Sequence, residues 1–248
     1  MFFVFLDNNG RWVYNCMVIK LEEIFMTKFI LIRHGQSEGN LKGLYLGHTD
    51  LDITELGREQ AEITAEYLKD EKIDAIYSSS LKRAHNTALP HANLHGLDVV
   101  DMEELKEIYL GVWDGVDVDV IRRDYRHEFD VEWKQEFGTY TPPGGESVKS
   151  SADRMYDALS RIAETSDGKC VLIVSHAAII RAFWCKISGY EPHTWGAMCP
   201  FPTNASITTV EYKDGKFYPK NFSFAEHFSE DFITGDKAVM QTKVVKND

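Results

Sequence analysis

The sequence is poor in the features that mark disulfide-rich, zinc-binding and membrane proteins. It has four cysteines in 248 residues, and none of them belongs to a Cys-x-x-Cys pair. This argues against a zinc knuckle and favours a reduced, cytoplasmic protein. No uninterrupted apolar run approaches the roughly 18 residues that cross a bilayer. The apolar stretch Phe2–Leu6 is stopped by Asp7 and is too short for a secretion signal. We therefore expect no membrane partner.

Positive charge is also scarce. There are 27 Lys and Arg residues against 39 Asp and Glu residues, which gives a formal net charge of −12 with His neutral. A nucleic-acid partner would need a basic face, so none is expected. A few arginines can still build a local positive pocket in an acidic protein. With 44% hydrophobic and 27% charged residues, the chain is typical of a folded protein with a sizeable core.

The first 25 residues differ from the rest of the chain. They mix apolar and charged residues without a clear period, and a further methionine stands at Met26. Two interpretations stay open: an appendage that begins at an upstream start codon, or an extra strand or hairpin. We expect residues 1–25 to be an N-terminal extension and residues 26–248 to form a single domain.

Short apolar strands alternate with helices after Met26. Thr54 is suited to cap a helix that runs to about Leu68, and Ser79 or Ser80 to cap the next one. The remaining expected elements are strands at 28–32, 73–77, 97–100 and 170–174, helices at 147–164 and 177–186, and a hairpin around 214–215. Strand–helix alternation predicts an α/β fold with a largely parallel sheet.

Polar residues follow three of the expected strands at the point where each strand ends. They are Arg33-His34-Gly35, then Ser78-Ser79-Ser80 with Arg83, and Ser175-His176. In open α/β sheets, ligands bind outside the carboxyl ends of the strands. Helix N-termini at this edge favour an anion, and two arginines add the forked donors that phosphate prefers. The sequence therefore predicts a phosphate site at this edge.

Six segments, in order, resemble the motifs of the histidine phosphatase superfamily, also called the phosphoglycerate mutase-like family. The resemblance covers about residues 27–212, and it implies a three-layer α/β/α fold with a small helical cap insertion at about 112–141. The segments are Leu31-Ile32-Arg33-His34-Gly35-Gln36-Ser37-Glu38-Gly39-Asn40; Gly47-His48-Thr49-Asp50 through Leu56-Gly57; Ser78 through Ala84 with Thr87-Ala88; Leu105-Lys106-Glu107 with Gly111-Val112-Trp113-Asp114-Gly115; Pro143-Gly144-Gly145-Glu146-Ser147; and Val174-Ser175-His176.

The resemblance implies a role for each matching residue, and it implies no metal ion and no cofactor. His34 matches the nucleophile that becomes phosphohistidine, and Glu107 matches the proton donor. The phosphate-binding positions match Arg33, Asn40, Arg83 and His176, with the backbone N–H of Ala177 as a further donor. Elementary chemistry agrees, because a neutral imidazole can attack phosphorus and guanidinium groups stabilise the phosphoryl oxygens.

Some residues depart from the pattern of the family. Ala177 stands where many members have Gly, and Asp114 stands where Glu is frequent; Asp114 is not expected to be catalytic. Mutases usually carry Arg and His in the acid motif, whereas this chain has Glu107-Ile108-Tyr109-Leu110-Gly111, and Gln36 replaces a typical Glu. This favours a phosphatase of small phosphate esters over a mutase or a binding-only member. The oligomeric state and the particular ester are not predicted.

The expected cap is rich in charged and aromatic residues. One or two of them are expected to touch the leaving group, from a set that includes Arg122, Arg123, Arg126 and Trp133. For each arginine, pairing with Asp117, Asp119 or Asp124 on the helix surface is the simpler expectation.

Overall fold

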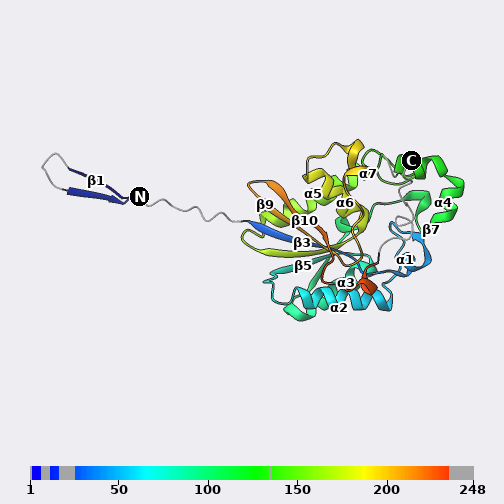
Figure 1. Ribbon diagram of the computed structural model, residues 1–248, viewed down its shortest axis with the longest axis horizontal. Coiled ribbons are helices and arrows are strands. Elements are labelled where there is room, and N and C mark those ends of the chain that lie inside the picture. Colours follow the sequence, from blue (N-terminus) through cyan, green and yellow to red (C-terminus); the bar gives the residue numbers. More distant parts are fainter. Residues whose placement is uncertain (1, 7–11, 17–25, 134–135, 235–248) are drawn as a thin grey trace.

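A six-stranded sheet forms the centre of the molecule, and helices cover both of its faces (Figure 1). The computed structural model describes residues 2–6, 12–16, 26–133 and 136–234. In spatial order the strands are β10 (Lys216–Phe224), β9 (Ile207–Lys213), β3 (Thr27–Arg33), β8 (Cys170–Ser175), β5 (Ala75–Ser79) and β6 (Val99–Met102). The last four run parallel, and β9 and β10 complete one edge antiparallel. The predicted α/β fold with a mostly parallel sheet is confirmed.

Two helices pack on each face of the sheet. These are α2 (Glu55–Tyr67) and α3 (Lys82–His95) on one face, and α5 (Val148–Glu164) and α6 (Ala177–Ile187) on the other (Figure 1). Side chains of the central strands β3 and β8 alternate between the two cores, because successive residues of a strand point to opposite faces. Those on the α5 and α6 side are Phe29, Leu31, Val171 and Ile173, and those on the α3 side are Ile30, Ile32, Leu172 and Val174.

The starts of α2, α5 and α6 were predicted correctly, and the cap of α3 was predicted wrongly. The hydroxyls of Thr54 and Ser147 each accept an N–H from the first turn of their helix, at 3.1 and 3.0 Å. Such a bond satisfies a backbone donor that has no partner within the helix. The helix α3 begins after Leu81, without a side-chain cap. Ser79 and Ser80 do not cap it, because their hydroxyls bond other side chains.

The cap contains helical segments, as expected, together with one short strand. Within 112–141 the structure has α4 (Val118–Asp124), a π-helical turn at Glu128–Trp133, and β7 (Val116–Asp117). The strand β7 pairs with β4 (Leu44–Tyr45), which follows α1 (Glu38–Lys42). Buried aromatic rings hold the cap together, with Trp113 stacked on Tyr140 at 5.6 Å between ring centroids. Short pieces elsewhere are α7 (Trp195–Met198) and 3₁₀ turns at 103–105, 111–113, 192–194 and 230–232.

The N-terminal extension contains an antiparallel pair, β1 (Phe2–Leu6) and β2 (Trp12–Cys16). This agrees with the hairpin interpretation for residues 2–16, while residues 7–11 and 17–25 lie outside the described residues. The role of the extension stays a prediction. Over the described part of the chain, no helix has both the length and the apolar character that a membrane crossing requires.

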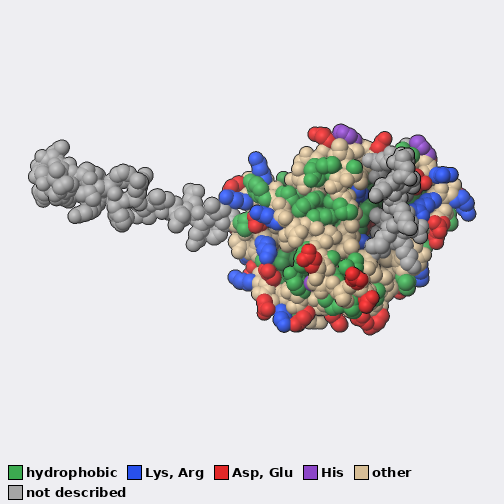
Figure 2. Space-filling view, in the orientation of Figure 1, with side chains coloured by type: hydrophobic (Ala, Val, Ile, Leu, Met, Phe, Trp, Pro, Cys, Tyr) green, Lys and Arg blue, Asp and Glu red, His purple; other side chains and the backbone are tan. Residues whose placement is uncertain are grey.

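Exposed side chains carry the acidic surplus. The four glutamates of α2, at positions 55, 59, 62 and 66, are all exposed. Figure 2 shows acidic side chains along the lower edge of the molecule, where α2 lies in Figure 1. The negative charge of the surface is therefore compatible with buried positive charge at the end of the sheet.

Candidate active site

The carboxyl ends of β3, β5 and β8 meet at one edge of the sheet, as the sequence predicted. His34 directly follows β3, and His176 directly follows β8. Their rings lie 5.2 Å apart between centroids, with an angle of 59° between the ring planes. The two side chains come together although they are 142 positions apart in the sequence (176 − 34). Both residues are buried, so their chemistry takes place out of bulk water.

The hydrogen bonds of His34 determine which ring nitrogen carries the lone pair. Its Nδ1 lies 2.7 Å from the carbonyl oxygen of Gly35. A carbonyl oxygen only accepts, so Nδ1 carries the proton and Nε2 carries the lone pair. Burial lowers the pKa of His34 well below its usual value, and the charges of Arg83 and Arg33 lower it further. The ring is therefore neutral at ordinary pH, with Nε2 available as a nucleophile.

The backbone around His34 is fixed on both sides. The His34 N–H donates to the carbonyl of Ser175 at 2.9 Å, and the buried Asn204 donates its amide N–H to the His34 carbonyl at 3.0 Å. At Gly35 a Cβ atom would lie 2.4 Å from the carbonyl oxygen of Gly57, so a side chain does not fit there. The sequence analysis missed Asn204, because it stands in a loop without a motif.

Arg83 lies fully buried beside the two histidines. Its Nη1 and Nη2 donate to the carbonyls of Thr49 and Gly47, at 2.9 and 2.7 Å. The Asp114 carboxylate in turn accepts the backbone N–H groups of residues 47, 48 and 49. Burial lowers the pKa of Arg83 to about 10, which still leaves it charged at neutral pH. Asp114, for which no catalytic role was expected, therefore holds the loop that positions Arg83.

His176 is held as a neutral ring by its two partners. Its Nδ1 lies 3.2 Å from Nε of Arg83, and its Nε2 lies 2.8 Å from the hydroxyl oxygen of Ser79. A guanidinium only donates, so Nδ1 carries the lone pair and Nε2–H donates to Ser79. Burial, and then the charge of Arg83, lowers the pKa of His176 well below its usual value. Sequence analysis placed Ser79 at the site edge but gave it a different role, as a helix cap.

Glu107 lies at the N-terminus of α6 rather than on the protein surface. Its Oε1 accepts the N–H groups of Ile108 and Ile179, both at 2.9 Å, and its Oε2 accepts that of Ala178 at 3.0 Å. The anion position that the sequence predicted at this helix N-terminus is thus partly used by the protein's own carboxyl group. Burial raises the pKa of Glu107, and it outweighs these N–H bonds and the charge of Arg83, which lower it. Glu107 therefore holds a proton more readily than an exposed glutamate.

Arg154 binds the backbone carbonyls at Glu107 and the residue before it. The guanidinium donates to the carbonyl of Lys106 at 3.0 Å and contacts that of Glu107 at 3.4 Å, while it pairs with the carboxylate of Glu146. On the other side, Nε2 of His48 lies 2.9 Å from the same Glu107 carbonyl. The sequence analysis did not single out Arg154, and it gave His48 no partner.

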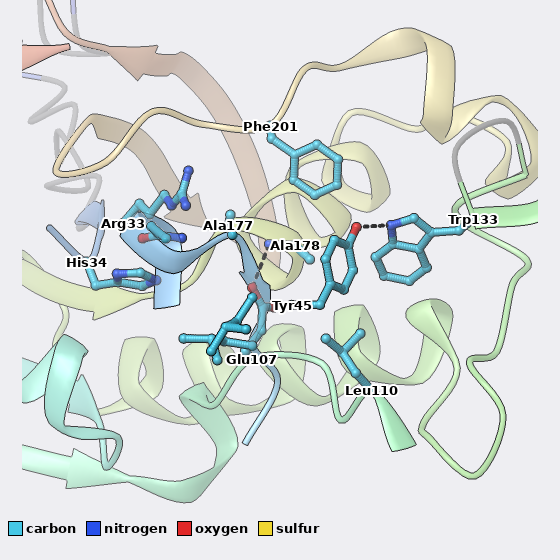
Figure 3. Close-up of a pocket in the computed structure, with 13 residues that line it drawn as sticks. Arg33, His34, Tyr45, Glu107, Leu110, Trp133, Ala177, Ala178 and Phe201 are labelled. Atoms are coloured by element: carbon cyan, nitrogen blue, oxygen red, sulfur yellow. Dashed lines mark hydrogen bonds between the residues drawn. The ribbon is translucent and has the colours of Figure 1, made fainter. Parts of the chain in front are cut away.

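A pocket joins these groups to the cap. Its polar end contains Arg33, His34, Asn40, Glu107 and Ala177. Figure 3 shows Arg33 and His34 together, with Glu107 and Ala177 next to them. The Asn40 oxygen accepts from the Ser37 hydroxyl at 3.0 Å and from Asn204 at 3.2 Å, so the amide N–H groups are the donors of this side chain. Of the residues predicted for the site, Arg83 and His176 do not line the pocket; they are buried next to His34.

The donors at the polar end suit an oxyanion. Guanidinium, amide and first-turn N–H groups are the usual partners of phosphate in proteins. Within the described ranges, no group of three or more His, Cys, Asp or Glu side chains could hold a metal ion.

Comparison with known proteins identifies a family. Residues 29–224 match the model of the histidine phosphatase superfamily (branch 1). Phosphoserine phosphatase 1 of Hydrogenobacter thermophilus is 32% identical over 215 residues, which cover 86% of this chain and 100% of that protein. A 2,3-bisphosphoglycerate-dependent phosphoglycerate mutase of Cytophaga hutchinsonii is also 32% identical, over 171 residues that cover 67% of this chain and 80% of that protein.

Solved structures show the same arrangement of elements. A mycobacterial glucosyl-3-phosphoglycerate phosphatase superposes with a TM-score of 0.74 at 27% identity, covering 81% of this chain and 100% of that chain. A phosphoserine phosphatase of Entamoeba histolytica, solved in complex with 3-phosphoglyceric acid, superposes with a TM-score of 0.70 at 30% identity, covering 81% and 98%. The mycobacterial enzyme was also solved with inorganic phosphate. Similar structures therefore bind small phosphate-containing ligands.

Proposed function

The chain belongs to branch 1 of the histidine phosphatase superfamily and is a phosphoric monoester hydrolase of small phosphorylated metabolites, and we propose that it works through a phosphohistidine on His34. The supporting observation is the bond from Nδ1–H of His34 to Gly35, which leaves the lone pair on Nε2. The proposal assigns this chemistry to residues 26–248 as one catalytic domain, with residues 1–25 as an extension. It requires neither a metal ion nor a cofactor.

The first half-reaction transfers the phosphoryl group to the protein. The lone pair on Nε2 of His34 attacks phosphorus, and the bond from phosphorus to the ester oxygen breaks. Glu107 donates its proton to that oxygen, so the leaving group departs as a neutral alcohol. The raised pKa of Glu107 supports this role, because the group must carry a proton when the ester binds.

The second half-reaction returns the protein to its starting state. A water molecule attacks the phosphorus of phosphohistidine, and the Glu107 carboxylate takes the proton from that water. The bond between phosphorus and Nε2 breaks, and its electron pair returns to the ring. The lowered pKa of His34 helps here, since a weakly basic nitrogen is a better leaving group. Inorganic phosphate is released, and Glu107 is protonated again.

The cationic groups stabilise charge on the transferring phosphoryl oxygens. Arg33 and Asn40 face the pocket and supply direct donors, and the N–H of Ala177 stands at the start of α6. Arg83 and His176 are buried beside His34, where the charge of Arg83 and the bond between Arg83 and His176 shape the same site. Donors that are fixed in place before reaction need little reorganisation in the transition state.

Water, rather than a second phosphorylated substrate, is the proposed acceptor. A mutase must hold a second anionic ester, and residues 108–111 provide Ile, Tyr, Leu and Gly instead of cationic side chains. Mutase activity is therefore the weaker alternative, despite the similarity to a phosphoglycerate mutase.

Trapping the covalent intermediate tests the proposal. The wild-type protein is mixed with phenyl phosphate in a single turnover and quenched in base, and the peptide that contains His34 is examined by mass spectrometry. We expect phosphate on His34, its loss in His34→Ala, and its retention in His193→Ala, which changes an exposed histidine. Turnover should also survive chelator. A phosphorylated residue other than His34, or appreciable turnover by His34→Ala, would reject the assignment. Exchange between phosphoglycerate isomers without phosphate release would favour the mutase.

A further inference from the structure

Beyond the reacting groups, the pocket continues as a chamber with apolar walls. The chamber is lined by Leu44, Tyr45, Leu46, Leu110, Trp133 and Phe201. Figure 3 shows Arg33 and His34 at one end of the pocket and Tyr45 and Trp133 at the other, with Phe201 above and Leu110 below. A phosphate ester bound at His34 would direct its alcohol portion toward this chamber.

The two aromatic residues at the far end present carbon surface to the chamber. The indole N–H of Trp133 donates to the Tyr45 hydroxyl, so each ring has a polar atom bonded to the other. The rings meet edge to face, with centroids 5.9 Å apart. Trp133 comes from the cap and Tyr45 from β4, so this contact also joins the cap to the main domain.

Phe201 is held in place by Arg181. The guanidinium carbon of Arg181 lies 4.3 Å from the Phe201 ring centroid, and the group donates to the carbonyls of Cys199 and Gly196, both at 2.7 Å. Arg181 is buried, with 3% of its surface exposed. Its donors are therefore engaged by the backbone that carries Phe201, rather than directed at a ligand.

Among the described residues, the chamber wall carries no Lys or Arg that could pair with an anionic leaving group. Arg33, at the phosphate end, is the one Lys or Arg among the described residues that line the pocket. Two cap arginines form surface ion pairs, Arg122 with Asp119 at 3.5 Å and Arg123 with Asp124 at 2.6 Å. A carboxylate placed against the apolar walls would lose its hydration without gaining a partner, which is costly.

We propose, on the basis of the phosphatase function above, that the preferred substrates are phosphate monoesters of uncharged, ring-bearing alcohols. The phosphate binds at the polar end, and the ring packs among Tyr45, Trp133 and Phe201. The similar proteins named for phosphoserine and glucosyl-3-phosphoglycerate act on esters that carry a carboxylate. This chain differs in selecting an apolar group at that position.

Three primary alkyl esters test the specificity, because their leaving groups have similar intrinsic reactivity. They are 2-phenylethyl phosphate, ethyl phosphate and phosphoserine. We expect kcat/KM for the phenylethyl ester to exceed the other two by about tenfold or more, since burial of an aromatic ring favours binding and transition state alike. Benzylphosphonate, which is not hydrolysed, should likewise inhibit the wild-type protein about tenfold more tightly than methylphosphonate.

Variants of the chamber wall connect the preference to the structure. In Phe201→Ala the phenylethyl-to-ethyl ratio of kcat/KM should fall about tenfold, and in Phe201→Leu it should fall less, because Leu keeps part of the apolar surface. Tyr218→Ala removes an exposed aromatic ring of β10 and should leave the ratio unchanged. A preference for phosphoserine, or equal inhibition by the two phosphonates, would overturn the inference and leave the phosphatase function intact. If none of the three esters is hydrolysed and no phosphate is found on His34, the proposed function is overturned instead.

Discussion

Replacing Glu107 by Gln should separate its role as an acid from its role in the fold. Gln has nearly the same shape, but it cannot donate a proton to a leaving alkoxide. We expect kcat/KM for alkyl phosphates, which reports only the steps up to phosphoryl transfer to His34, to fall by about 10²–10⁴, the usual contribution of a positioned general acid. For 4-nitrophenyl phosphate the loss should be about tenfold or less, because nitrophenolate leaves without a proton.

The structural cost of the same change follows from the hydrogen bonds of Glu107. The Gln oxygen can take the place of Oε1 and keep the N–H groups of Ile108 and Ile179. The amide nitrogen then faces the N–H of Ala178, which loses the acceptor that lay 3.0 Å away. One buried donor without a partner costs about 1–3 kcal/mol of unfolding free energy. The variant should therefore fold with reduced stability, and thermal melting measures that loss separately from kinetics.

The assay compares rates for a series of esters whose leaving-group pKa varies. A plot of log kcat/KM against that pKa should be steeper for Glu107→Gln than for wild type, and Glu103→Gln, which changes an exposed carboxyl, should keep the wild-type slope. An equal loss of kcat/KM for nitrophenyl and alkyl esters would show that another group supplies the proton.

Three further predictions concern loop position and proton binding. Asp114→Asn should lower kcat/KM by about tenfold or more, because the loop that holds Arg83 loses part of its anchoring, while Asp114→Glu should retain most activity; steady-state kinetics of both variants checks this. The kcat/KM profile of wild type should stay high below pH 6.5, because the pKa of His34 is lowered and its ring stays neutral there; a rising limb at or above pH 6.5 would contradict this. Burial lowers the pKa of His91 to about 3, so only the unfolded chain takes up this proton between pH 6.5 and 4. The wild-type free energy of unfolding should therefore fall by about 2 kcal/mol between pH 7 and pH 5 because of His91. This part of the fall should be absent in His91→Leu, as measured by urea unfolding at both pH values.

The order of strands and helices could be predicted because its causes are local. The run at 170–174 is continuously apolar since helices cover both faces of β8, and Thr54 and Ser147 cap their helices through bonds three residues away. Local reasoning failed at Ser79, whose hydroxyl bonds His176, 97 residues further along the chain. The Ser79 hydroxyl therefore bonds His176 and does not cap the helix α3. The helical character of the cap segment was expected, whereas the packing of aromatic rings around Trp113 was not predicted.

The site could be predicted only in part for a similar reason. Residues that follow strand ends meet in space through sheet topology, which brought His34 and His176 together. The residues that position them bind backbone carbonyls or N–H groups far away in the sequence. Asn204 reaches the His34 carbonyl across 170 positions, and Arg154 reaches the Glu107 carbonyl across 47. No side-chain pattern in the sequence marks a backbone partner, so these roles become visible only in the fold.

Substrate binding and the proton on Glu107 should be coupled. Two arginines and one carboxyl group are the buried charged side chains around His34, and the charge of Arg83 lowers the pKa of Glu107. A bound phosphate ester brings negative charge close to Arg83, which offsets the effect of Arg83 on Glu107 and repels the ionised form of Glu107. The pKa of Glu107 should therefore rise further in the complex. Because kcat reports the complex and kcat/KM the free protein, the falling limb of kcat should lie at higher pH than that of kcat/KM. If the two falling limbs coincide, the bound phosphate does not change the pKa of Glu107, and another group is the acid.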